Sequence, residues 1–101
     1  MRLFVFLNPT NKRGTKTAYT DFRKELMKMG FLMVQPEVYM RVISSRRACD
    51  RFLTRMYEKA PPTGRIVAYK LTENQFSKTL YITGEKSAQE RVIGSNSVIV
   101  L

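Results

Sequence analysis

The chain has 101 residues, a formal net charge of +10, one cysteine and no histidine. This length suits a single domain with one modest core, and the lack of histidine excludes Ser-His-Asp and Cys-His hydrolytic sites. No apolar run has the roughly 20 residues of a membrane helix, no signal-peptide pattern is present and Cys49 has no internal disulfide partner, so we expect a cytoplasmic protein with no membrane contact.

The positive charge lies mainly in residues 1–60. A small, strongly basic domain favours a polyanionic partner such as nucleic acid. The alternative is that these charges only keep the protein soluble.

Residues 2–8 form an apolar strand that ends at Leu7-Asn8-Pro9-Thr10, and "PTNKRGTKT" follows as a loop. The sequence predicts a helix over 15–29, because its apolar residues recur at spacings of three and four: Tyr19, Phe22, Leu26 and Met29.

Residues 31–43 are the longest strand candidate, with Pro36 indicating a bulge or an edge position. One face is apolar (Val38, Met40, Val42) and the other is polar (Glu37, Tyr39, Arg41). A second helix is predicted over 46–60, capped by Ser44 or Ser45. Its apolar stripe comprises Cys49, Phe52, Leu53, Met56, Tyr57 and Ala60, so Cys49 is interpreted as a core residue and not as a nucleophile.

The remaining expected elements are strands over 65–71, 79–83 and 97–101, with a short capped helical turn from Thr72 to Gln75 between the first two. Alternating helices and strands favour an α+β sandwich, and we expect a ferredoxin-like βαββαβ fold with an extra C-terminal strand. The whole of 1–101 is interpreted as one domain. Its tail, 84–101, is expected to contact a second copy in a homodimer or another partner.

Seven short motifs occur in a particular order along the chain: "FRKEL", "GFLMVQ", "VY", "PPTG", "TENQF", "ITGE" and a C-terminal "VIVL". Together they resemble the Cas-two family of CRISPR adaptation proteins, in the form found in type II systems. The resemblance covers nearly the whole chain. It implies a ferredoxin-like homodimer that bridges two dimers of the Cas-one integrase and holds duplex DNA for spacer acquisition.

Members of that family have also been described as metal-dependent endonucleases, an activity tied to an Asp-x-Pro motif at the end of the first strand. Aligning Pro9 places Leu7 at the Asp position and Asn8 at the intervening one. Leu7 offers no ligand to Mg²⁺, which is held by carboxylates. Glu37 stands where the family usually has Ser, and one hypothesis is that it restores a carboxylate near Leu7. Because ferredoxin-like strand order separates the first two strands, Glu37 is interpreted instead as a solvent-facing residue.

The basic residues supply the candidate DNA contacts, since duplex binding needs Lys and Arg along the phosphates. Lys12, Arg13 and Lys16 lie in a loop before a helix N-terminus, where backbone donors favour anions. Arg41, Arg46, Arg47 and Arg51 complete the set, and each of these residues has a solvated surface position as its alternative.

Three hypotheses follow from the sequence. The first is a non-catalytic subunit of the spacer-acquisition complex, with no catalytic residues, metal or cofactor of its own. The second is a divalent-metal endonuclease of RNA or DNA, which the family supports and Leu7 opposes. The third is a free RNA-binding or toxin-like ribonuclease domain, in which Tyr39 or Tyr69 would stack on single-stranded bases.

Overall fold

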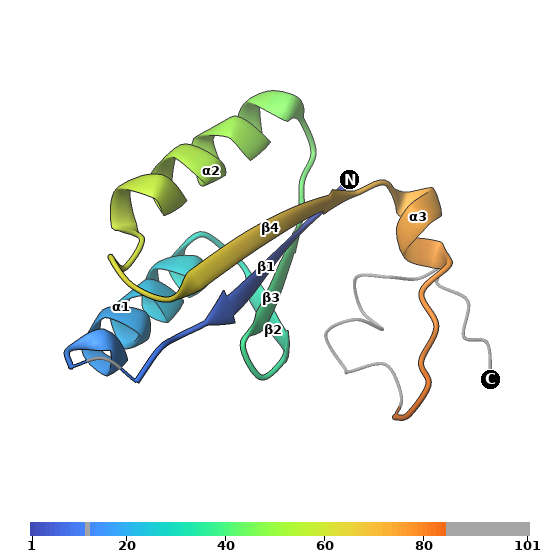
Figure 1. The fold of residues 1–101 in the computed structure, drawn as a ribbon. Helices are drawn as coiled ribbons and strands as arrows, with labels where there is room; N and C mark the ends of the chain where they lie inside the picture. The colour runs from blue at the N-terminus through green and yellow to red at the C-terminus, as the bar shows by residue number, and fades with distance from the viewer. Residues whose placement is uncertain (12, 85–101) are drawn as a thin grey trace.

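The computed structural model describes residues 1–11 and 13–84, and their elements run β1 (Arg2–Asn8), α1 (Thr15–Lys28), β2 (Leu32–Gln35), β3 (Val38–Val42), α2 (Arg46–Lys59), β4 (Arg65–Leu71) and α3 (Glu73–Ser77). The four strands form one antiparallel sheet in the order β2-β3-β1-β4. Helices α1 and α2 lie on the same side of this sheet (Figure 1). The βαββαβ order and the ferredoxin-like arrangement are therefore confirmed.

The segment 31–43, expected to be one strand, is a hairpin. Gln35 pairs directly with Val38, and Pro36 and Glu37 form the turn between them. Pro36 has the fixed φ favoured at the first central position of a turn, and Glu37 has a φ of 65° at the second, as in a type II turn. This hairpin supplies the fourth strand of the sheet, in place of the strand expected over 79–83.

Residues 79–83 form no strand. Both the amide and the hydroxyl of Thr79 donate to the carbonyl oxygen of Phe76, at 3.0 and 2.6 Å, which ends α3. The chain then passes beside the face of the sheet that α1 and α2 leave uncovered (Figure 1). The final strand expected over 97–101, and all of the tail beyond Gly84, lie outside the described residues.

The core lies between the sheet and the two long helices. It is built from alternate residues of β1 and the apolar stripes of α1 and α2: Leu3, Val5, Leu7, Tyr19, Phe22, Leu26, Met29, Cys49 and Met56. The α1 stripe and the burial of Cys49 are confirmed. The α2 stripe is wrong at two positions. Tyr57 is 84% exposed, because its side chain lies about 80° from Cys49 around the helix, beyond the buried sector. Ala60 is also exposed, because α2 ends at Lys59 and Ala60 adopts an extended backbone.

The register of β3 reverses the expected faces of this strand. Tyr39 pairs with Val5 and Arg41 pairs with Leu3, so both belong to the helix-covered side of the sheet. Val38, Met40 and Val42 pair with the residues of β1 that point to the opposite side. Aromatic side chains gather there, with Phe6 and Tyr69 in an edge-to-face contact at 5.5 Å between ring centroids.

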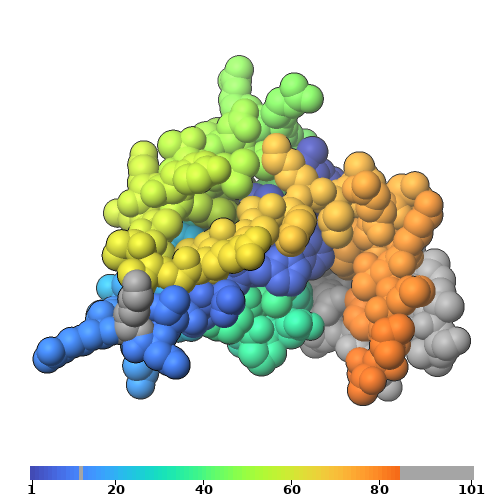
Figure 2. Space-filling view, in the orientation of Figure 1, coloured from blue at the N-terminus to red at the C-terminus, as the bar shows by residue number. Residues whose placement is uncertain are grey.

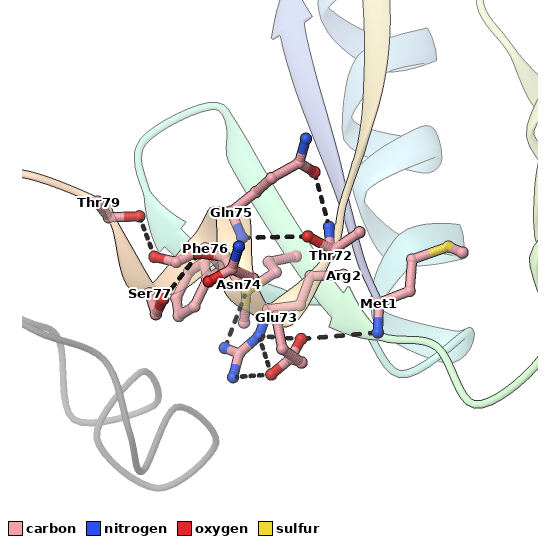
Figure 3. Close-up of polar contacts among 10 residues, drawn as sticks. Met1, Arg2, Thr72, Glu73, Asn74, Gln75, Phe76, Ser77 and Thr79 are labelled. Atoms are coloured by element: carbon pink, nitrogen blue, oxygen red, sulfur yellow. Dashed lines mark hydrogen bonds and ion pairs between the residues drawn. The ribbon is translucent and has the colours of Figure 1, made fainter.

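Helix α3 is held on this second face by Arg2, as Figure 3 shows. The Arg2 side chain is almost fully buried, lies 3.8 Å above the Phe76 ring centroid and donates to both oxygens of Glu73 at 2.9–3.1 Å. The expected capping box is confirmed: the Gln75 amide donates to the Thr72 hydroxyl at 3.1 Å, and the Thr72 amide donates to the Gln75 side chain at 2.9 Å.

The hydrogen bonds from Arg2 are the main cause that lowers the pKa of the Glu73 carboxyl below its usual value. A carboxyl whose pKa is lower in the folded than in the unfolded state stabilises the fold above its unfolded pKa. The Arg2–Glu73 contact therefore supports α3 at neutral pH, and its contribution is lost as the pH falls through the lowered pKa.

No helix within residues 1–11 and 13–84 combines the length and the apolar character needed to cross a bilayer.

Candidate nucleic-acid interface and the end of the first strand

Leu7 stands at the end of β1 with its side chain in the core. It is 6% exposed, and its backbone N–H donates to the carbonyl oxygen of Glu37 at 2.9 Å. Asn8, the next residue, is exposed. The first strand therefore ends in an apolar side chain that packs under the helices and holds no group able to bind a cation.

Glu37 is a direct neighbour of Leu7, contrary to the expected separation of the two strands. The hairpin places Glu37 in the turn directly before β3, and β3 pairs with β1. Its side chain is 34% exposed, but its carboxylate is not free, because both oxygens accept hydrogen bonds from Arg23 of α1, at 2.9 and 2.8 Å. This bidentate pair is the main cause that raises the pKa of Arg23, and it fastens the β2–β3 turn to α1.

A network of hydroxyl groups surrounds the same end of β1. The hydroxyls of Thr15 and Thr63 are 2.9 Å apart, and those of Thr10 and Thr15 are 3.4 Å apart. Tyr19 donates its phenol proton to the carbonyl oxygen of Thr63 at 2.8 Å, and burial is the main cause that raises the pKa of Tyr19. These contacts connect the β1–α1 loop and α1 to the α2–β4 loop.

These residues do not fit the divalent cation that the family's Asp-x-Pro motif implies. Hard cations such as Mg²⁺ need carboxylate oxygens with free lone pairs. Leu7 supplies none, and Glu37 is already engaged by Arg23. Among the described residues, no three His, Cys, Asp or Glu side chains come together as a set of ligands.

The loop between β1 and α1, together with the first turn of α1 that contains Lys16, carries the first group of basic residues. Arg13 and Lys16 are exposed on either side of Gly14, whose φ of 84° marks the turn into α1. No acidic residue lies in the first turn of α1, and no side chain caps this helix end by a hydrogen bond. Lys12 lies outside the described residues.

Arg41 is placed differently from the other candidate residues. It was expected on a polar strand face, but it lies on the helix side, with its guanidinium carbon 4.6 Å from the Phe52 ring centroid. Its Nη1 donates to the carbonyl oxygen of Met29 at 3.2 Å, at the C-terminal end of α1. Its Nε is buried and has no hydrogen-bond partner among the described residues, so packing against Phe52 and the Met29 contact fix this side chain.

The remaining candidate residues, Arg46, Arg47 and Arg51, lie on the exposed side of α2 and line a groove of about 1120 Å³ together with Arg41. Lys28 and Met29, at the end of α1, form the opposite wall. The structure therefore brings together four of the expected DNA-contacting residues. The two described residues of the loop, Arg13 and Lys16, are not among the residues that line this groove.

The two tyrosines of the single-strand hypothesis differ in their access to solvent. Tyr39 is 3% exposed and belongs to the core, so its ring is not available for stacking on a base. Tyr69 is 55% exposed on the open face of the sheet, where it packs against the edge of Phe6.

The sequence reasoning missed the Arg23–Glu37 pair. Its one signal was Pro36, which favours the first central position of a turn. Glu37 gave none, because the positive φ of the second central position is usually adopted by Gly or Asn. With the turn placed at Pro36 and Glu37, the hairpin brings the carboxylate back toward α1. The prediction of a single strand over 31–43 did not include this turn.

The fold and the end of β1 define a ferredoxin-like protein with a basic surface and an altered first-strand motif. The family model of CRISPR associated protein Cas2 matches residues 13–79, which is more than half of the chain. The chain belongs to this family, the Cas-two family, whose role lies in CRISPR adaptation.

Curated relatives agree with this assignment over nearly the full length. A "CRISPR-associated endoribonuclease Cas2" of Streptococcus mutans serotype c (strain NN2025) is 32% identical over 98 residues, which cover 97% of this chain and 90% of that protein. Proteins of the same name from Treponema denticola and Acidovorax ebreus are 31% and 28% identical, over 88% and 97% of this chain and 89% and 97% of their own lengths.

Proposed function

We propose that this chain is a non-catalytic subunit of the CRISPR spacer-acquisition complex. As a homodimer it holds duplex DNA and bridges dimers of the Cas-one integrase, whose active sites perform the integration. The observation that carries the proposal is the end of β1: Leu7 packs in the core, and the neighbouring Glu37 is bound by Arg23 at 2.8–2.9 Å.

The open face of the sheet supports the homodimer. Phe6, Val42 and Tyr69 are 39–55% exposed there, and exposed apolar clusters of this kind mark interaction surfaces. A second copy of the chain is the partner we assign to this face. The tail beyond Gly84 is proposed to contact the second copy or the integrase, and residues 1–101 are proposed to form one domain.

The β1–α1 loop supports DNA binding. Arg13 and Lys16 flank Gly14 at the N-terminus of a 14-residue helix, and helix N-termini attract phosphate through their free N–H groups. Contacts of this kind are made to the phosphate backbone of the DNA and do not distinguish one base sequence from another. We infer that the loop, including Lys12, binds duplex DNA irrespective of its sequence.

The alternative function is a metal-dependent endonuclease, the activity that the relatives' printed name states. This activity would need a set of carboxylates outside the described residues. A cleavage assay with divalent metal and with chelator separates the two functions.

The loop yields the first prediction. We expect wild-type protein to bind short duplex DNA with an affinity that falls steeply as salt increases. Each phosphate contact contributes about 0.9 to the slope of log K against log salt concentration. The Arg13→Gln/Lys16→Gln variant, which removes two such contacts, should therefore have a slope that is shallower by about 1.8. Fluorescence anisotropy across a salt series measures these slopes.

The matched control removes the same charge elsewhere. Lys24→Gln/Lys78→Gln neutralises two exposed lysines that have no acidic partner among the described residues. Its slope stays close to that of wild type. Equal losses in the two variants would show that net charge acts alone, and would remove the loop from the proposal.

A further inference from the structure

We propose that the groove between α2 and the C-terminal end of α1 is a second nucleic-acid site, which holds the phosphate backbone of a duplex independently of the β1–α1 loop. This inference rests on the proposed function, because it assigns the same ligand class to the same protein. It adds a separate surface on the helix side of the sheet.

The first argument is the distribution of unpaired charge. Several cations near the two long helices have an acidic partner: Arg23 pairs with Glu37, and Arg55 and Lys28 share Glu25. Arg46, Arg47 and Arg51 have no ion-pair or hydrogen-bond partner among the described residues. The uncompensated charge on this side of the molecule is therefore concentrated at the first turns of α2.

The second argument is that this cluster opposes the stability of its own helix. Helix N-termini are positive and favour acidic residues, yet the first turn of α2 has none and carries Arg46 and Arg47 instead. Arg47 and Arg51 are also like charges at a spacing of four, which repel each other. A bound anion would relieve both effects, so the cluster has the character of a binding surface.

The third argument is that the floor of the groove is already ordered. Arg41 is fixed by its stacking on Phe52 and its hydrogen bond to the Met29 carbonyl, so its charge is positioned before a ligand arrives. Among the described residues, seven cationic side chains line the groove against two carboxylates, Asp50 and Glu58, and two of the seven, Lys28 and Arg55, share Glu25. The groove therefore favours a polyanion over a neutral ligand.

The arrangement fits phosphates and not bases. Arg47 and Arg51 are one helical repeat apart, about 6 Å along the axis, which is comparable to the spacing of successive phosphates on one strand. Within the part of the chain that the structure describes, the one aromatic ring that lines the groove, Phe52, lies under the Arg41 guanidinium. Bases would find no open platform for stacking, so the contact is with the backbone of a duplex.

The groove and the loop are separate surfaces. The groove wall contains Lys28 and Met29 at one end of α1, whereas Arg13 and Lys16 lie at the other end, and 14 residues of helix span about 21 Å. Figure 2 shows the start of α2 projecting at the top of the molecule and the β1–α1 region projecting at the lower left.

The test compares three variants in the salt-dependence assay. Arg46→Gln/Arg47→Gln/Arg51→Gln is expected to lose about 2.7 from the salt slope, at about 0.9 for each contact. Combining it with the loop substitutions is expected to remove about 4.5, because independent sites add. The control Lys24→Gln/Lys70→Gln/Lys78→Gln removes the same charge and leaves the slope near that of wild type.

Folding is checked in the same series. The triple Arg variant should unfold at the same denaturant concentration as wild type or at a higher one, because it relieves repulsion. A second measurement needs no substitution. Phenylglyoxal modifies accessible arginines of the wild-type protein, and mass spectrometry measures the extent of modification at each one. Duplex DNA should reduce the modification of Arg46, Arg47 and Arg51.

Two results would overturn the second site while leaving the proposed function intact. In one, the triple Arg variant behaves like the Lys control although the loop variant loses affinity. In the other, duplex DNA leaves the labelling of the three arginines unchanged. Failure of the proposed function looks different, because wild-type protein would then not bind duplex DNA in any arm of the experiment.

Discussion

Replacing Gly64 with Ala should lower the free energy of unfolding by about 3 kcal/mol or more. Gly64 has a φ of 83°, and an added Cβ would collide with the Tyr19 hydroxyl and lie 2.8 Å from the backbone oxygen of Asn8. Neither neighbour moves easily, since Tyr19 is buried and bonded to Thr63 and Asn8 belongs to β1. Chemical denaturation followed by circular dichroism measures the loss.

Gly14 provides the matched control for that substitution. Its φ is 84°, almost the same as that of Gly64, but an added Cβ meets no atom within 4 Å. Gly14→Ala therefore carries only the backbone strain of a left-handed residue, about 1–2 kcal/mol. Equal losses in the two variants would show that Tyr19 and Asn8 do not pack as tightly at the end of β1 as the structure has them.

Leu7→Asp should also lower the free energy of unfolding by about 3 kcal/mol or more, and divalent cations should not restore it. The new carboxylate would stand in the core beside Ile66, its partner on β4, at a position that is 6% exposed. Glu37 would not help to bind a cation, because Arg23 already holds both of its oxygens. Thermal unfolding with and without Mg²⁺ or Mn²⁺ measures this.

Leu7→Asn separates charge from shape in this experiment, because Asn matches Asp in size and remains neutral. Burial raises the pKa of a carboxyl, so the loss in Leu7→Asp should shrink as the pH falls and the side chain becomes neutral, while the loss in Leu7→Asn stays constant. A metal ion that stabilised Leu7→Asp and not Leu7→Asn would contradict our conclusion that this site does not fit a cation.

Much of the fold could be predicted from local patterns. The stripe from Tyr19 to Leu26 and the capping box at Thr72 depend on neighbouring residues only, and the structure confirms both. The prediction of a strand over 79–83 was wrong, because its sequence pattern indicates β propensity but does not show whether a neighbouring strand is available for pairing. Thr79 instead hydrogen-bonds back to Phe76, which ends α3.

The candidate site was predicted less completely, because its details depend on contacts between distant segments. The many basic residues of α2 are visible in the sequence. The pairing of Arg55 with Glu25 is not, because Glu25 lies 30 positions away in the chain. Arg41 was placed on the wrong face because a strand with two differently polar faces does not show which one the helices cover. Its stacking on Phe52 emerges only from the packed core.

The central claim is that this Cas2-family chain lacks a hydrolytic site of its own, and a cleavage assay on wild-type protein tests it most directly. Labelled RNA and duplex DNA are incubated with the protein and Mg²⁺ or Mn²⁺, with parallel samples in chelator. Our account predicts bound but intact nucleic acid in every sample. Metal-dependent cleavage that chelator stops, and that elutes together with the folded protein through purification, would contradict it.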